Sequence, residues 1–438
     1  MEQIKKTKIV WICHFSNSKV RHKLPLSNLI IQNFFRRILH KKTYIIHKDF
    51  APWINNLINE FENFYDIELH IISPHKGLKR FTSEFEINGI HYHFFKAELP
   101  FFLRIIQEVI FKSKPKKFLL NRYFGKRFIK SISPDLINLI GTENPYYSAI
   151  SLDIKSIPIY VSLQTIFSNP DRKIHSIDYD QIRWDTELKI LKKEKYFGCI
   201  GGIHGDLALK QNPQAILLKN FFPIEKPKNI KKVPKKYDFV FFASTVSPKK
   251  GIEDALEALF IVKHIKPDVS LNIVGRCPHD YQPKLLNLIE EKKLSENIIF
   301  NEYFPIHSDM HQHIMKSRFA LLPVKLDVIP GTIIEAMMLG IPVVAYKTSG
   351  TPYLNKEIET VLLADIGDIR TLSTFMLRLL ESKELAISLS SNAKMFAEKE
   401  FDNNILARRI ALNYKAIIDH YYNNKEIPKE LLLNTQEF

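Results

Sequence analysis

The order of apolar and polar residues along the chain predicts an alternation of strands and helices. Short apolar runs, which indicate buried strands, are separated by longer stretches with apolar residues at helical spacing. The runs predicted as strands are 8–13, 67–72, 86–95 (a strand pair turning at Asn88-Gly89), 135–140, 157–162, 237–243, 269–275, 297–300 and 343–346. The stretches predicted as helices are 26–39, 53–64, 180–195, 252–265, 285–294, 307–316, 332–339, 372–380 and 385–422. Because strands that alternate with helices form parallel sheets, the pattern predicts an α/β protein.

One segment interrupts this alternation near the middle of the chain. Residues 224–236 are charged, contain prolines and have no apolar period, so they predict a linker between two domains. A chain of 438 residues is long enough for two domains with separate cores. We therefore expect domains at 1–223 and 237–415, and a helix with a tail at 416–438. The expected fold is α/β, with two doubly wound parallel-sheet (Rossmann-like) domains facing a cleft.

Composition is that of an ordinary globular protein, with 45% apolar and 25% charged residues. No apolar run approaches the roughly 20 residues that a membrane-spanning helix needs. The first residues show no long apolar segment before a cleavage site, so no signal peptide is expected. Cys13, Cys199 and Cys277 are odd in number and far apart, which disfavours a disulfide framework or a cysteine metal site. A cytoplasmic protein is expected.

The net charge of +16 would suit nucleic acid, an anionic membrane surface or acidic substrates. Residues 101–130 mix aromatic and basic side chains, and no acid follows Glu108 until Asp135. One interpretation is a contact with an anionic membrane, at the inner face of the cytoplasmic membrane. The other, about equally favoured, is a core helix with a solvated lysine face. Nucleic acid is not expected as a partner, because the aromatic residues have helical rather than strand spacing.

The richest candidate chemistry lies at 327–350, DVIPGTIIEAMMLGIPVVAYKTSG. A turn-rich loop with Asp327 precedes a predicted helix that carries Glu335 and ends at a glycine. Gly331 and Thr332 place free backbone N–H groups at the start of that helix, which suits an anion such as a phosphate. The alternative is a loop acid and a solvated helix acid, but the apolar residues around Glu335 argue against simple exposure.

This stretch resembles the signature of glycosyltransferase family 4, the retaining nucleotide-sugar enzymes of the GT-B fold. That family has an acid, seven residues, a glutamate followed by Ala-Met, then Gly-x-Pro and Val-Val-Ala. The matching residues here are Asp327, Glu335, Ala336, Met337, Gly340, Pro342, Val343, Val344 and Ala345. The first acid is usually glutamate in the family and is aspartate here. The resemblance implies that Glu335 holds the ribose of the donor, that Asp327 contacts the donor sugar, and that no metal or other cofactor is needed.

The resemblance also assigns a diphosphate site to the loop after the strand 237–243. The family usually has an arginine, four residues and Lys-Gly there. This chain has Lys250 followed by glycine, but Thr245 stands in the place of the arginine. Arg276, which follows Gly275 at the end of the next strand, and Lys249 are nearby cations that could replace the missing charge.

The first domain is expected to bind the acceptor. His14 and Asn17 follow its first strand and could contact the acceptor or the donor sugar, although a polar loop is an equal alternative. Glu143 and Gln164 follow two later strands, and the family often has a histidine where Gln164 stands. His307 and His311 have the spacing of a helical metal pair, but no third ligand stands beside them in the sequence, so no metal site is expected.

The function expected from this resemblance is retaining transfer of a sugar from a nucleoside diphosphate sugar to a glycan or lipid-linked acceptor, in surface polysaccharide or lipopolysaccharide synthesis. The last helix would cross back to the first domain. The alternative is a non-catalytic GT-B protein that binds nucleotide sugar or glycan in a polysaccharide assembly complex. Thr245 and Gln164 at two functional positions motivate that alternative.

Overall fold

The computed structural model describes residues 6–27, 30–38, 49–97, 118–169, 180–200, 202–301 and 303–433. Parts of the predicted segments 26–39, 101–130 and 416–438 therefore lie outside the described residues. The chain forms two compact units. Unit 1 comprises the described parts of Met1–Ile200, His204–Pro223 and Leu406–Leu433, and unit 2 those of Gly201–Ile203 and Ile224–Ile405.

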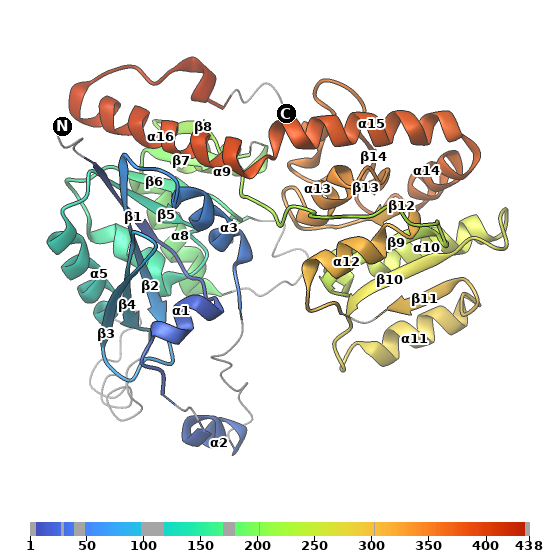
Figure 1. Cartoon of the computed structure of the whole chain (residues 1–438), viewed down its shortest axis with the longest axis horizontal. Helices are drawn as coiled ribbons and strands as arrows, with labels where there is room; N and C mark the ends of the chain where they lie inside the picture. Colours follow the sequence, from blue (N-terminus) through green and yellow to red (C-terminus); the bar gives the residue numbers. More distant parts are fainter. Residues whose placement is uncertain are drawn as a thin grey trace. The chain divides into compact units, whose positions relative to one another are not determined.

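Unit 1 is built on an eight-stranded sheet in the order β3-β4-β2-β1-β5-β6-β7-β8 (Figure 1). Every neighbouring pair is parallel except β3 and β4. These two form a hairpin at Asn88-Gly89, where both residues have positive φ as a tight primed turn requires. The strands are β1 (Thr7–Ile12), β2 (Ile67–His75), β3 (Thr82–Ile87), β4 (Ile90–Lys96), β5 (Leu136–Ile140), β6 (Ile159–Ser162), β7 (Tyr196–Cys199) and β8 (Ile216–Lys219).

Helices cover both faces of this sheet. The helices of this part of the chain are α1 (Ser18–Lys23), α2 (Ile30–Ile38), α3 (Pro52–Phe61), α5 (Leu119–Ile132), α6 (Pro145–Ser148), α8 (Gln181–Lys193), α9 (Ile203–Gln211) and α16 (Asn403–Asn423). Helices α3 and α16 pack on the face that carries Trp11, where the Tyr414 hydroxyl accepts a hydrogen bond of 2.6 Å from Asn138 Nδ2. Helix α5 packs on the opposite face, where the Phe128 ring lies 5.2 Å from that of His93.

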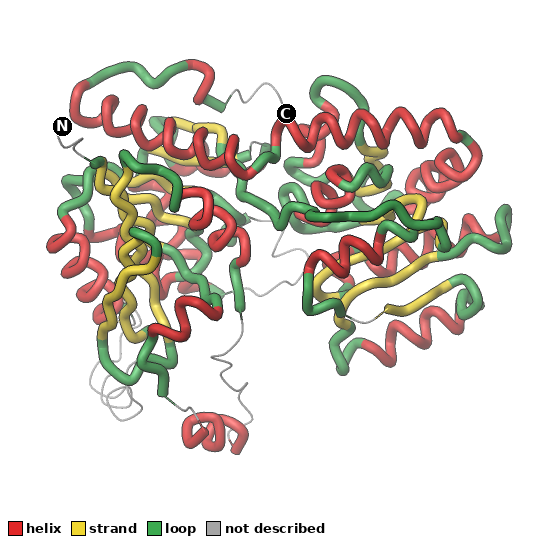
Figure 2. The backbone as a smooth tube through the Cα atoms, in the orientation of Figure 1, coloured by secondary structure: helices red, strands yellow, loops and turns green. Residues whose placement is uncertain are grey.

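Unit 2 is built on a six-stranded parallel sheet in the order β11-β10-β9-β12-β13-β14. The strands are β9 (Tyr237–Thr245), β10 (Leu271–Arg276), β11 (Ile298–Asn301), β12 (Ser317–Leu322), β13 (Val343–Tyr346) and β14 (Val361–Ala364). The helices are α10 (Ile252–Lys263), α11 (Gln282–Glu291), α12 (His307–Ile314), α13 (Gly331–Met338), α14 (Ile369–Glu381) and α15 (Lys383–Glu400). Figure 2 shows the alternation of strands and helices in this unit. The strand order 3-2-1-4-5-6 is that of a Rossmann fold.

The core of unit 2 follows from the alternation of side chains along its strands. Phe239, Phe241 and Ile273 point to the face packed by α10, α11 and α14. Asn272 points to the other face, where its Nδ2 lies 3.2 Å from His313 Nε2 of α12. Both faces are therefore covered, which explains why the strands read as continuous apolar runs rather than alternating ones.

The structure corrects the predicted helix at 385–422. Two helices, α15 and α16, replace it, because Asp402 interrupts the helical path. Its Oδ1 accepts hydrogen bonds from the backbone N–H groups of Asn404 and Ile405, as a capping residue does at the start of a helix. The pattern also missed β7, β8, β12 and β14, whose short runs were not recognised as strands.

The predicted linker, 224–236, contains no helix or strand and is held to unit 2. Lys231 N donates to Gln312 Oε1 at 2.8 Å, and Gln312 Nε2 donates back to Lys231 O at 3.0 Å. Among the described residues, no helix is long and apolar enough to cross a bilayer.

Candidate functional site

The carboxyl ends of β9 and β12 mark the point where the strand order of unit 2 changes direction. Parallel α/β sheets bind ligands at such a switch point. Lys250 follows β9 and Asp327 follows β12, and the Lys250 ammonium forms an ion pair with the Asp327 carboxylate. Their side chains are 33% and 43% exposed, so both groups can reach a ligand. The fold thus brings together two charges that are 77 residues apart in the sequence.

Gly251 fixes the place of Lys250. Its φ is +81°, and a Cβ there would lie 1.8 Å from the Pro323 carbonyl oxygen. Only glycine tolerates both the conformation and the close approach. The loop after β9 is therefore pressed against the end of β12, which positions Lys250 beside the loop that carries Asp327.

The start of α13 contributes the backbone N–H groups predicted at Gly331 and Thr332. Pro330 precedes the helix in extended conformation, and no side chain caps its first turn. A Cβ at Gly331 would meet only Ile224 Cγ2, at 3.8 Å, so this turn is not crowded. The uncapped N-terminus can therefore offer its N–H groups to an anion.

Glu335 lies on α13 and is 7% exposed. His307 Nε2 is 3.2 Å from its Oε1, and His311 Nε2 is 3.6 Å from its Oε2. Burial alone would raise the pKa of Glu335, but the two histidines outweigh burial and lower it. In turn, burial would lower the pKa of His307, and its hydrogen bond to Glu335 outweighs that effect and raises it. Glu335 is therefore held as a carboxylate.

The sequence did not predict that His307 and His311 would lie next to Glu335. Sequence reasoning found no third ligand beside them, whereas the structure brings Glu335 close enough that the three could hold a metal ion. The available signal was the pair spacing on α12, but nothing local to the sequence connects α12 to α13.

Arg276 lies beside Thr245, the residue that stands where the family usually has an arginine. The strand register pairs Arg276 with Thr245, both exposed at the end of the sheet. Gly275 allows this arrangement, because its φ is +142° and a Cβ there would lie 2.0 Å from the Ala243 carbonyl oxygen. The Arg276 guanidinium also lies 4.9 Å from the ring centroid of Tyr303. A cation is therefore present next to Thr245.

The glycine loop after β13 holds the Asp327 loop in place. Thr348 Oγ1 donates to the Val328 carbonyl at 2.6 Å, and Gly350 N donates to the same oxygen at 3.2 Å. A Cβ at Gly350 would lie 2.6 Å from Val328 Cγ1. This loop therefore supports Asp327 through its neighbour Val328.

In unit 1, the loop after β1 carries the two predicted residues His14 and Asn17, which have different surroundings. Asn17 caps α1, since its Oδ1 accepts from Val20 N at 2.8 Å, and its Nδ2 donates to Asn55 Oδ1 at 2.7 Å. These bonds give Asn17 a structural role. His14 packs against the Phe50 ring at 4.5 Å, and burial lowers its pKa to about 4, so the ring is neutral at pH 7.

Glu143 lies in the loop after β5, the strand next to β1. Burial raises its pKa to about 7, although the Tyr147 hydroxyl donates to its Oε1 at 3.2 Å. Its Oε2 is buried without a hydrogen-bond partner among the described residues. The Tyr147 ring lies 6.3 Å from that of His14, so these groups form one cluster. Gln164, after β6, has a buried Nε2 that likewise lacks a partner in the described part of the chain.

Comparisons with known proteins find similarities in the C-terminal part of this chain. Residues 223–396 match the family model of glycosyl transferases group 1. The amylovoran biosynthesis glycosyltransferase AmsK of Erwinia amylovora is 26% identical over 178 residues, 39% of this chain and 43% of that protein. The putative colanic acid biosynthesis glycosyltransferase WcaL of Escherichia coli K12 is 26% identical over 186 residues, 41% of this chain and 45% of that protein. The alignments thus span under half the length of these relatives.

Solved structures share the fold over nearly the whole chain. Sucrose-phosphate synthase from Thermosynechococcus elongatus has a TM-score of 0.65 at 14% identity, covering 94% of this chain and 98% of that one. Anabaena HepE, solved with UDP and glucose, has a TM-score of 0.61 at 16% identity, covering 94% and 100%. These similarities confirm the predicted GT-B class with two parallel-sheet α/β domains.

Proposed function

We propose, because residues 223–396 match the family model of glycosyl transferases group 1, that this chain is a glycosyltransferase using a nucleoside diphosphate sugar. The observation that carries the proposal is the position of Lys250, Asp327 and Glu335 around the switch point of unit 2. The names of the relatives in amylovoran and colanic acid biosynthesis favour a surface polysaccharide or lipopolysaccharide as the product.

The diphosphate would bind between Lys250 and the N-terminus of α13. An incoming phosphate would compete with Asp327 for the Lys250 ammonium, so donor binding would release the Asp327 carboxylate. The free N–H groups at Gly331 and Thr332 would receive a second phosphate oxygen. Arg276 supplies the other positive charge in place of Thr245, since it is the register partner of that residue.

Glu335 would accept hydrogen bonds from the two hydroxyls of the ribose. The carboxylate is already ionised and oriented by His307, so a hydroxyl donor meets a fixed acceptor. This interaction is uniform binding rather than chemistry, because the ribose does not change during transfer.

Asp327, once released from Lys250, would face the donor sugar. As the bond from the anomeric carbon to the leaving phosphate breaks, positive charge develops on the sugar ring. A fixed carboxylate stabilises that charge more in the transition state than in the ground state. We propose that the acceptor oxygen bonds to the anomeric carbon on the face from which the diphosphate departs, and that its proton passes to the departing phosphate oxygen, so that the anomeric configuration is retained. No metal ion is assigned to this step.

Unit 1 would bind the acceptor at the carboxyl ends of β1 and β5. His14 offers a neutral, partly exposed ring, and Glu143 offers a carboxyl whose Oε2 has no hydrogen-bond partner among the described residues. Gln164 can donate to a sugar hydroxyl but cannot take a proton. These groups suit a neutral, hydroxyl-rich ligand.

Helix α5 supports a contact with the membrane that would carry a lipid-linked acceptor. Its buried face holds Phe128 and Ile129 in the core, as the core-helix interpretation expects. That interpretation does not explain why Leu119, Leu120 and Tyr123 are exposed on the same helix as basic side chains. Exposed apolar groups beside cations suit an anionic membrane surface. Residues 101–117 of the predicted segment lie outside the described residues.

The second candidate is a non-catalytic protein of the same fold, favoured by Thr245 in the diphosphate loop. A thermal-shift series with UDP, GDP, ADP and their sugars separates the two functions. Binding at about 100 times the Kd should add about 2.7 kcal/mol of stability. The donor that shifts the wild type should then be turned over, in the presence of EDTA as well. No shift with any nucleotide would support the non-catalytic protein.

Glu335→Ala provides the matched test of the site. It should abolish the nucleotide shift and the transfer while the protein without ligand unfolds cooperatively. The control is Glu357→Gln, which changes an exposed carboxylate paired with Lys399. Turnover that persists in Glu335→Ala would rule out this site.

A further inference from the structure

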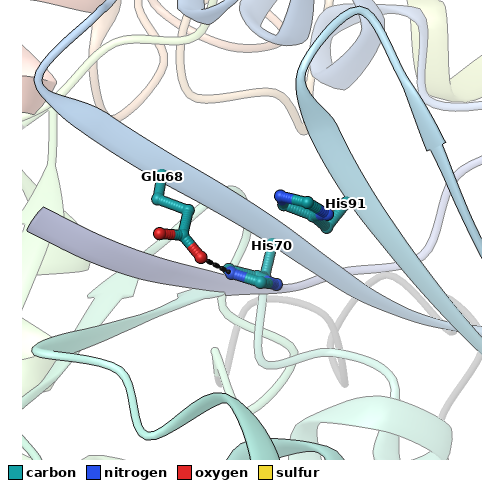
Figure 3. Close-up of side chains that lie close together, drawn as sticks. All are labelled: Glu68, His70 and His91. Carbon is teal, nitrogen blue, oxygen red and sulfur yellow. Dashed lines mark hydrogen bonds and ion pairs between the residues drawn. The ribbon is translucent and has the colours of Figure 1, made fainter. Parts of the chain in front are cut away.

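One face of the sheet in unit 1 carries histidine and glutamate side chains on neighbouring strands. Glu68 and His70 are two apart on β2 and therefore share a face, and the parallel register places His91 of β4 beside His70. Figure 3 shows the three side chains, with the hydrogen bond of 3.0 Å between His70 Nε2 and Glu68 Oε1. The rings of His70 and His91 are stacked with centroids 4.6 Å apart.

The same face continues onto the hairpin. His93 is two residues beyond His91, and the antiparallel register pairs it with Glu84 of β3. His93 Nδ1 is 2.7 Å from Glu84 Oε2, and His93 Nε2 is 3.0 Å from His70 Nδ1. A continuous series of side-chain hydrogen bonds therefore runs from Glu68 through His70 and His93 to Glu84. His70 and His93 are only 7% and 8% exposed.

With both carboxylates ionised, the hydrogen bonds from Glu68 to Glu84 need a third proton or a metal ion. The outer nitrogens, His70 Nε2 and His93 Nδ1, each face a carboxylate oxygen and must donate a proton to it. The inner nitrogens are 3.0 Å apart, so one of them must donate to the other. Two neutral imidazoles carry only two protons, and three are needed. A metal ion bound to His70 Nε2 removes the shortage, because the remaining two protons then satisfy the inner pair and Glu84.

We propose that Glu68, His70 and His91 form a binding site for a zinc-like divalent transition metal ion. One ligand atom from each side chain lies within 4.8 Å of the others, and two imidazoles with a carboxylate are a set that zinc binds with an open fourth position. His93 and Glu84 would orient His70, as a histidine partner and a carboxylate do behind many metal ligands.

The surroundings set this site apart from the end of the sheet where a substrate would bind. Glu68 and His91 stand near the amino ends of β2 and β4, whereas ligands of such sheets bind at the carboxyl ends. The Lys8 ammonium lies 3.7 Å from Glu68 Oε1 and opposes a cation, while Glu86 Oε2 lies 3.6 Å from His91 Nδ1 and favours one. An ion at this place would tie β2 to the β3–β4 hairpin at the edge of the sheet.

The test uses the full chain, freed of metal with a chelator and dialysed against ZnCl2. Bound zinc is measured by mass spectrometry, and affinity by calorimetry. His70→Gln and His91→Gln should each remove one zinc per chain, with a loss of affinity above about 100-fold, and Glu84→Gln should weaken it about 10-fold to 100-fold. The exposed His279→Gln should bind as the wild type does.

The second histidine cluster provides the decisive control. His307, His311 and Glu335 have the same composition, so His307→Gln tests whether they hold the zinc instead. The proposal is overturned if the wild type binds no zinc and the cluster carries a third proton instead. It is also overturned if binding survives in His91→Gln and is lost only in His307→Gln. His91 is partly exposed, so its variant should fold, which circular dichroism without metal checks.

Discussion

The two units place different chemistry at the same point of similar sheets. At the switch point of unit 2, the side chains are charged and paired, as in Lys250 with Asp327 and His307 with Glu335. At the switch point of unit 1, between β1 and β5, His14 is a neutral ring, and burial raises the pKa of Glu143 to about 7 and so opposes its charge. A diphosphate is an anion that fixed positive charge binds, and a ribose offers hydroxyls to a carboxylate, whereas a glycan offers neutral hydroxyls and apolar ring faces. The difference teaches that the two sheets suit the two kinds of substrate in the proposed reaction.

The largest expected effect is on catalysis, from Asp327→Asn. The carboxylate that would stabilise the developing charge is lost while the shape is kept, so kcat should fall by about 10²-fold to 10³-fold. KM for the donor should change much less, which a steady-state assay with varied donor measures. A variant that retains wild-type kcat would remove the charged site of unit 2 from the mechanism. Asp368→Asn, at an exposed helix cap, serves as the control.

The second effect tests unit 1 through the pH dependence of stability. The pKa of Glu143 is raised to about 7, so the folded state keeps a proton that the unfolded chain releases from about pH 4.5. Its stabilisation is complete below the unfolded pKa and is lost as pH rises through 7, a change of roughly 3 kcal/mol. Glu143→Gln should remove this loss, so its urea midpoint should decline less than that of the wild type between pH 4.5 and 8. Parallel pH profiles would show that Glu143 is not buried as described.

The third effect is on the affinity for the diphosphate and comes from the charge of Lys250. Lys250→Met keeps much of the side-chain length and removes a charge-assisted hydrogen bond worth about 1.5–3 kcal/mol. Nucleotide diphosphate affinity should therefore fall by roughly 10-fold to 150-fold in calorimetry. Lys383→Met, the same change at an exposed lysine of α15, is the control. Equal losses in both variants would indicate general charge attraction rather than a defined contact.

The smallest expected effect is a gain in affinity for the diphosphate. Thr245→Arg restores the arginine that the family usually has, beside Arg276 in the register. One more exposed charge should tighten diphosphate binding by a few-fold, with about 1 kcal/mol as the upper range. A neutral outcome would mean that Arg276 already fills this role, and Arg276→Gln should then weaken binding. A tightening of several hundred-fold would mean instead that the site lacks a cation altogether.

Much of the fold was readable because local spacing carries it. The turn at Asn88-Gly89 and the end of α13 at Gly340 were predicted from residues whose conformation is nearly dictated by their own chemistry. Short central strands such as β12 were missed, because a run of a few apolar residues has no period of its own. The break between α15 and α16 was missed because Asp402 acts as a cap only where its carboxylate meets free N–H groups.

The sequence by itself determined the α/β class and the donor motif, since both depend on residues that are neighbours along the chain. Only the tertiary structure decided which side chains meet across elements. His307 of α12 reaches Glu335 of α13, and Arg276 stands beside Thr245 because β9 and β10 share a register. Likewise, the hydrogen bond between His70 and His93 exists only because β2 pairs with β4. Strand register and helix packing come from the burial of the whole core, which no local pattern of residues reports.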